Sequence, residues 1–78
     1  MKFIITRTSD DDYIEIKEFA SIQSLIDFMN EVQDKLIIKN NFWHEEDTTY
    51  LKKWYPHLDV DEIVNIPYEI EIYDDYRE

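Results

Sequence analysis

Histidine and acidic side chains, the groups that most often hold metals or move protons, cluster once in this sequence. His44, Glu45, Glu46 and Asp47 are consecutive, so three carboxylates follow a histidine directly. The zinc pattern H-E-x-x-H requires its second histidine at position 48, but that position is a threonine and the next histidine is His57. The run therefore predicts a solvated loop and no metal site.

A second acidic run, Asp59-Val60-Asp61-Glu62, resembles the first half of a calcium-binding loop. That loop also needs a central glycine and a closing bidentate glutamate, and both are missing here. Acidic side chains in the first turn of a helix complement the positive end of the helix dipole. Asp59 and Glu62 also have the spacing of a capping box. We therefore expect a short helix that begins at Asp59 and binds no metal.

Composition removes several classes of function. The chain has no cysteine, which excludes disulfides and thiolate metal sites, and no glycine, which excludes P-loops and dinucleotide-binding fingerprints. Neither histidine is accompanied by a recognisable nucleophile and an orienting carboxylate, the partners that a catalytic triad requires. We therefore expect a non-enzyme without a cofactor. Turns with a positive φ would have to use asparagine or aspartate, and the candidates are residues 10–12, 40–41 and Asn65.

Length and charge indicate the kind of domain. The 78 residues are 44% hydrophobic and predict one folded domain, residues 1–78, despite a net charge of −11. No apolar stretch approaches the roughly 20 residues of a membrane span, and the apolar start is too short for a signal peptide. We therefore expect a cytoplasmic protein with no membrane contact. With 8 basic and 19 acidic residues, the chain would repel a phosphate backbone, which disfavours direct binding to nucleic acid.

Hydrophobic periodicity predicts the elements that position these side chains. Residues 2–8 and 13–19 are expected to form a hairpin around the acidic turn at 10–12. Ser21 is the expected N-cap of the main helix. An apolar stripe at helical spacing follows it, with Phe28 at its edge, and is formed by Ile22, Leu25, Ile26, Met29 and Val32.

The second half predicts a strand at 35–39, a short helical insert within 42–65 and a last strand at 68–72. The element order is strand, strand, helix, strand, short helical insert, strand. This order predicts an α+β domain in which a mostly antiparallel sheet of about four strands packs on one main helix.

The acidic surplus lies in the C-terminal half of the chain. Residues 1–39 carry eight acids and five bases, whereas residues 40–78 carry eleven acids and three bases. If the isoleucines of the last strand face inward, its acidic residues face outward in a row about 6.6 Å apart, a spacing comparable to that of DNA phosphates. Charge on an edge strand also prevents aggregation, which is the commoner reason for such a row. The candidate contact residues are Asp59, Asp61, Glu62, Glu69, Glu71, Tyr73, Asp74 and Asp75.

Aromatic side chains between residues 42 and 55 suggest another contact. Most aromatic residues of so small a domain are expected in its core, but an exposed tryptophan can anchor an interface. Trp43 is followed by charged residues, so it is a better candidate for such an anchor than Trp54.

The two ends of the chain, MKFIITRTS at residues 1–9 and YEIEIYDDY at residues 68–76, resemble small acidic proteins encoded by phages and prophages of low-GC Gram-positive bacteria. Some phage proteins of this size and charge are inhibitors that mimic DNA and block host glycosylases, restriction enzymes or CRISPR effectors. No inhibitor motif is matched residue by residue, so the resemblance implies no particular binding residues.

These observations lead to two hypotheses. The first is a non-enzymatic interaction domain that binds a basic protein, of the kind that itself binds nucleic acid, through its C-terminal acidic face. The alternative is a phage accessory or structural protein that forms a homodimer and so covers its aromatic surface.

Overall fold

The structure, a computed structural model, describes residues 1–74. In chain order its elements are β1 (Lys2–Arg7), β2 (Ile14–Glu18), α1 (Ile22–Glu31), β3 (Lys35–Asn40), the 3₁₀ turn η1 (Glu45–Asp47), α2 (Thr48–Trp54), α3 (Val60–Ile63) and β4 (Tyr68–Tyr73). The α+β class and the expected order of elements are confirmed. No helix in this part of the chain has the length and apolar character needed to cross a bilayer.

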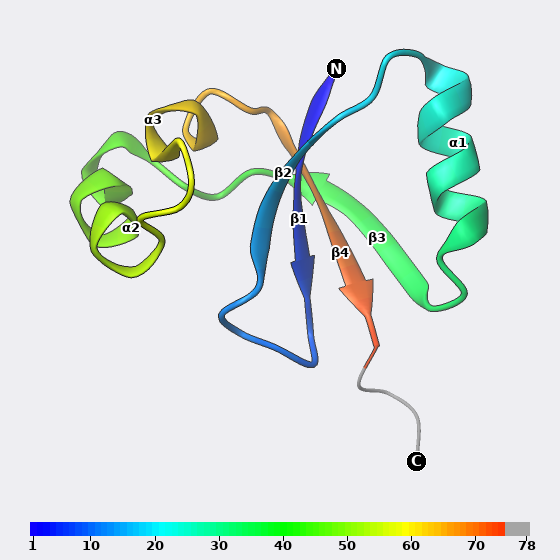
Figure 1. The fold of residues 1–78 in the computed structure, drawn as a ribbon, viewed down its shortest axis with the longest axis horizontal. Helices are drawn as coiled ribbons and strands as arrows, with labels where there is room; N and C mark the ends of the chain where they lie inside the picture. The colour runs from blue at the N-terminus through cyan, green and yellow to red at the C-terminus, as the bar shows by residue number, and fades with distance from the viewer. Residues whose placement is uncertain (75–78) are drawn as a thin grey trace.

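The four strands form one mixed sheet in the order β2-β1-β4-β3 (Figure 1). β1 pairs antiparallel with β2 and parallel with β4, and β3 pairs antiparallel with β4. The sheet is therefore mostly antiparallel, as expected. The first and last strands of the chain lie side by side at its centre, which leaves β2 and β3 as the edges.

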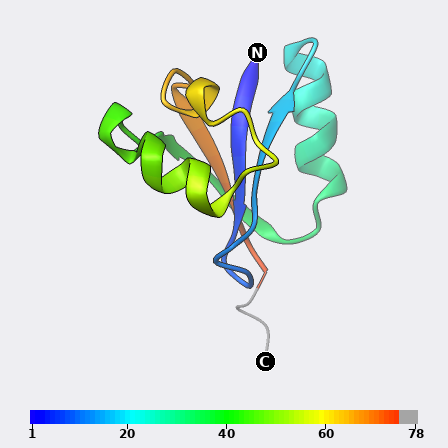
Figure 2. The ribbon, with the colours of Figure 1, turned by 60° about the vertical axis from the view of Figure 1, so that its left-hand side comes forward.

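Helices cover both faces of this sheet, with α1 on one side and the α2–α3 segment on the other (Figure 2). The α1 face buries Phe3, Ile5, Ile70 and Ile72. On the opposite face, side chains from the sheet and the helical insert form a separate buried cluster. Its members are Ile4, Ile14, Leu51, Val60, Ile63 and Ile66. The expectation of packing on one main helix therefore describes only half of the arrangement. The helical insert supplies the second layer, packing on Ile4 of β1 and Ile14 of β2.

α1 begins at its expected cap but faces the sheet differently from expectation. The Ser24 amide donates to Ser21 Oγ and the Ser21 amide donates to Ser24 Oγ, both at 3.1 Å, so the predicted N-cap is confirmed. Leu25 is buried, but Ile22 and Ile26 are 60% and 42% exposed. The contact side consists of Leu25 with the partly buried Phe28, Met29 and Val32. The Phe28 ring packs edge-on against Phe19, with centroids 5.4 Å apart, so the contact side of the helix runs through Phe28 and leaves Ile22 and Ile26 exposed.

The expected outward row of acidic side chains on β4 is wrong. Glu69 is only 1% exposed, whereas Glu71 and Tyr73 are partly buried. These side chains do not form an exposed row, because β4 is a central strand whose second face lies under the helical insert. The backbone also differs from expectation, because no residue of the described range has a positive φ. Its acidic and asparagine turns therefore avoid the left-handed region altogether.

Candidate functional site

A cavity of about 260 Å³ lies on the face of the sheet that the helical insert covers. Four aromatic residues, Tyr13, Phe42, Trp43 and Tyr55, contribute to its lining. β4 contributes Glu69 and Glu71, and neighbouring strands and the β1–β2 loop add Thr6, Ile14, Asp11 and two cations, Arg7 and Lys39. The cavity thus combines aromatic walls with three carboxylates and two basic side chains, and its carboxylates and aromatic rings are groups that attract a cation.

Glu69 is the most unusual residue of this cavity, because a carboxylate is rarely buried so completely. Thr6 Oγ1 donates a hydrogen bond to Glu69 Oε2 at 2.6 Å. The other oxygen, Oε1, is buried without a hydrogen-bond partner among the described residues. A buried acceptor without a donor is costly, so Glu69 is a poor choice for stability alone.

Lys39, on the edge strand β3, is the cation nearest to this carboxylate. Its Nζ lies 3.3 Å from Glu71 Oε1 and 4.0 Å from Glu69 Oε2. The same ammonium lies 6.0 Å from the centre of the Phe42 ring. Strand register explains the placement, because Lys39 is directly opposite Glu69 and on the same face of the sheet as Glu71.

Trp43 forms part of the cavity wall, and the expectation that it is an exposed anchor is wrong. It is half-buried, packs against the cluster beneath the helical insert and stacks on Phe42 with centroids 4.7 Å apart. Its Nε1 is buried and, within residues 1–74, lacks an acceptor. The exposed tryptophan is Trp54, at 58%, whose ring lies 6.2 Å from that of Tyr50.

Asn41 holds this wall in place, a role that the sequence did not reveal. Its Nδ2 donates to the carbonyl oxygens of Ile63 and Ile66, both at 2.7 Å, and its Oδ1 accepts from the Trp43 amide at 2.9 Å. One side chain therefore joins the end of β3, the start of the insert and the end of α3. The only available signal was the Asn-Asn pair, which is typical of any turn.

The β1–β2 loop adds negative charge at the cavity. Asp10, Asp11 and Asp12 are exposed, and none of them forms an ion pair with another described residue. The Asp12 amide donates to Asp10 Oδ1 at 3.0 Å, which shapes the turn. Partial burial, followed by the charge of Asp12 and of its loop neighbours, raises the pKa of the Tyr55 hydroxyl. The field of this loop therefore reaches the aromatic wall.

The C-terminal acids proposed from the sequence are dispersed, and most are paired. Glu62 forms an ion pair with Lys2, and Asp61 forms one with Lys52 at 3.3 Å. Asp59 is exposed ahead of α3 but makes no side-chain capping bond, so the predicted capping box is wrong. Asp75 lies outside the described residues. Sequence reasoning missed the contribution of the acidic loop at 10–12, whose Asp11 lines the cavity.

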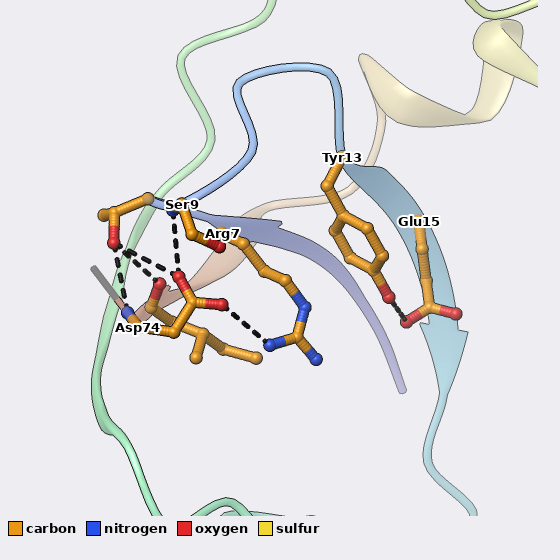
Figure 3. Close-up of polar contacts among 7 residues, drawn as sticks. Arg7, Ser9, Tyr13, Glu15 and Asp74 are labelled. Atoms are coloured by element: carbon orange, nitrogen blue, oxygen red, sulfur yellow. Dashed lines mark hydrogen bonds and ion pairs between the residues drawn. The ribbon is translucent and has the colours of Figure 1, made fainter.

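Asp74, a candidate contact residue, is held at the end of the sheet by hydrogen bonds. The Ser9 amide donates to its Oδ1 at 2.9 Å and Arg7 Nη1 donates to its Oδ2 at 3.1 Å (Figure 3). Hydrogen bonding from Ser9, reinforced by the Arg7 guanidinium, lowers the pKa of Asp74 to about 2. On its other side Arg7 lies 5.0 Å from the centre of the Tyr13 ring, and Tyr13 donates to Glu15 at 2.9 Å (Figure 3). The contacts of Asp74 join the ends of β1 and β4.

Within residues 1–74, no group of histidine, aspartate and glutamate side chains is arranged to hold a metal ion. Comparisons of the chain with protein-family models, curated proteins and solved structures found no match. The site is therefore interpreted from its own chemistry.

Proposed function

We propose that this chain is a non-enzymatic domain that binds a basic partner protein, of the kind that itself binds nucleic acid. The observation that carries the proposal is the gathering of carboxylates around one aromatic-lined cavity. Glu69 and Glu71 lie in its lining and the exposed Asp10, Asp11 and Asp12 lie beside it.

Charge pairing favours this region over the paired acids of the C-terminal half. Basic side chains of the chain partly neutralise Asp61, Glu62 and Asp74. The three aspartates of the β1–β2 loop have no such ion pair within residues 1–74, so their field is available to an approaching cation. Exposed charge of one sign steers an oppositely charged protein and makes association sensitive to salt.

Affinity capture with mass spectrometry tests the proposal, using the unmodified protein and a variant with Asp10→Asn, Asp11→Asn and Asp12→Asn. Asparagine preserves the acceptor of the loop's hydrogen bond and removes the charge. We expect the unmodified protein to capture basic proteins at about 0.1 M salt and to release them near 1 M, where the Debye length falls to about 3 Å. The captured protein, once purified, should bind directly in a calorimeter.

A matched control carries Glu45→Gln, Glu46→Gln and Asp59→Asn, which change the net charge equally at exposed positions outside the cavity lining. The control should retain the partner that the loop variant loses. Equal capture by all three proteins would contradict the proposal, because the loop would then play no part.

The alternative, a homodimer of an accessory protein, draws support from the exposed Tyr50 and Trp54 on α2. Light scattering after size exclusion tests it. A dimer that dissociates on Trp54→Ala would favour self-association over a basic partner.

A further inference from the structure

An ammonium group already lies against this site, because Lys39 brings its own Nζ there. That ammonium contacts Glu71, approaches Glu69 and lies near the face of Phe42. The protein thus places one cation beside both carboxylates and an aromatic ring. An ammonium from another molecule would find the same groups.

Two buried polar atoms of the cavity residues lack partners within residues 1–74, and they are of opposite kinds. Glu69 Oε1 is an acceptor without a donor, and Trp43 Nε1 is a donor without an acceptor. A lysine in a peptide carries both missing partners, because its ammonium donates and the main-chain carbonyls beside it accept. A hydrogen bond to a buried carboxylate is also stronger than one formed at the surface.

The size of the cavity points to a side chain. Its volume of about 260 Å³ is below the roughly 300–1,000 Å³ typical of small-molecule pockets. Its aromatic lining suits the alkyl stem of a lysine, which packs along apolar surface while its charged end reaches a polar group.

We propose that this cavity is a recognition pocket for the side-chain ammonium of a lysine on the basic partner. The inference rests on the proposed function and names the group that the site recognises. Lys39 acts as an internal competitor. Its side chain is 39% exposed, so it moves into solvent at little cost when the partner's lysine enters, because ion pairs at such positions are weak.

The test is a titration with blocked lysine, Nα-acetyl-lysine N-methylamide, against three analogues. Blocked norleucine lacks the charge, blocked arginine changes its shape, and blocked trimethyl-lysine keeps the charge but cannot donate a hydrogen bond. The protein carries Trp54→Phe, so the indole N–H signal of Trp43 is the only one in the nuclear magnetic resonance spectrum. We expect blocked lysine to shift that signal saturably and to bind most tightly of the four.

Two variants connect this binding to the cavity. Glu69→Gln should weaken blocked lysine about tenfold or more, whereas Glu46→Gln, the same change at an exposed site outside the lining, should not. Lys39→Met should strengthen binding about two- to fivefold by removing the competitor. Lys52→Met makes the same charge change on α2, paired there with Asp61, and should have no such effect.

Other results overturn the inference. Equal binding of norleucine would show an apolar pocket, tighter binding of trimethyl-lysine would show that the aromatic walls dominate, and tighter binding of arginine would replace the ligand class. If blocked lysine fails to bind while a basic partner still binds through the Asp10–Asp12 loop, the pocket is wrong and the proposed function stands. If neither blocked lysine nor a basic partner binds, both the lysine pocket and the proposed function are wrong.

Discussion

The burial of Glu69 costs stability, and the proposed lysine pocket would give this carboxylate a reason for its position. A buried carboxylate with one unpaired oxygen and a cation 4.0 Å from the other oxygen gains little from its ion pair. Replacing a buried ion pair with neutral groups is often harmless or stabilising. Residues that lower stability in this way are concentrated at functional sites.

Glu69→Gln should therefore leave the free energy of unfolding unchanged or raise it by about 1 kcal/mol, because the amide oxygen still accepts from Thr6 while the buried charge is removed. Urea denaturation measures the change. Glu46→Gln is the control and should stay within about 0.5 kcal/mol of the unmodified protein. A loss of more than about 2 kcal/mol in Glu69→Gln would show that the charge itself holds the fold together.

The lowered pKa of Asp74 predicts how stability depends on pH. Its pKa is lowered from 3.8 to about 2, so its folded form favours the ionised carboxylate. The stability that it contributes is fully present above its ordinary pKa and is lost as the pH falls toward 2. Thermal melts should show that Asp74→Asn lowers the melting temperature at neutral pH and reduces the loss on acidification between pH 4 and pH 2.

Asp59→Asn is the comparison for that experiment, because Asp59 is exposed and has no capping bond. Its acid profile should match that of the unmodified protein. An Asp74→Asn profile as steep as the unmodified one would show that the contacts with Ser9 and Arg7 do not lower the pKa of Asp74.

At the scale of elements, α1 shows that the apolar stripe read from a sequence can include residues that do not contact the sheet. The helical period identified the helix and its cap correctly. It did not reveal that Phe28 would pack against Phe19, because that contact depends on the end of β2. The insert shows the same limit, since its apolar residues were visible but the strand face that they cover, formed by Ile4 of β1 and Ile14 of β2, was not.

Leu25→Ala and Ile26→Ala test the orientation of α1. Leu25 is buried against the sheet, so its truncation should cost about 2–5 kcal/mol of unfolding free energy. Ile26 is largely exposed, so the neighbouring change should cost less than about 1 kcal/mol. Chemical denaturation of both variants decides the matter, and equal costs would mean that the helix faces the sheet along the stripe predicted from the sequence.

At the scale of the whole molecule, the net charge of −11 acts through its distribution in space. The surplus in the second half of the chain is partly cancelled, because Lys2, Arg7 and Lys39 of the first half pair with Glu62, Asp74 and Glu71. The least compensated acidic segment beside the cavity is the β1–β2 loop. That loop and the end of β4 lie at the same end of the sheet (Figure 1).

The loop variant with Asp10→Asn, Asp11→Asn and Asp12→Asn should be more stable than the unmodified protein at low salt, by a few tenths of a kcal/mol per residue. The gain arises because like charges in a strongly acidic molecule repel one another. It should shrink near 1 M salt, where the charges are screened. Thermal melts across this range measure the effect, and a stability difference independent of salt would contradict its electrostatic origin.

The sequence by itself determined the α+β class, the order of the elements, the N-cap at Ser21 and the positions of the strands, because these depend on periodicity and capping between near neighbours. Only the tertiary structure decided that Glu69 is buried, that Trp43 forms a cavity wall and that most C-terminal acids are paired. The reason is the strand order β2-β1-β4-β3, which places β4 between β1 and β3 and so brings Thr6, Lys39 and Glu69 together. No local pattern encodes a neighbour 63 positions away.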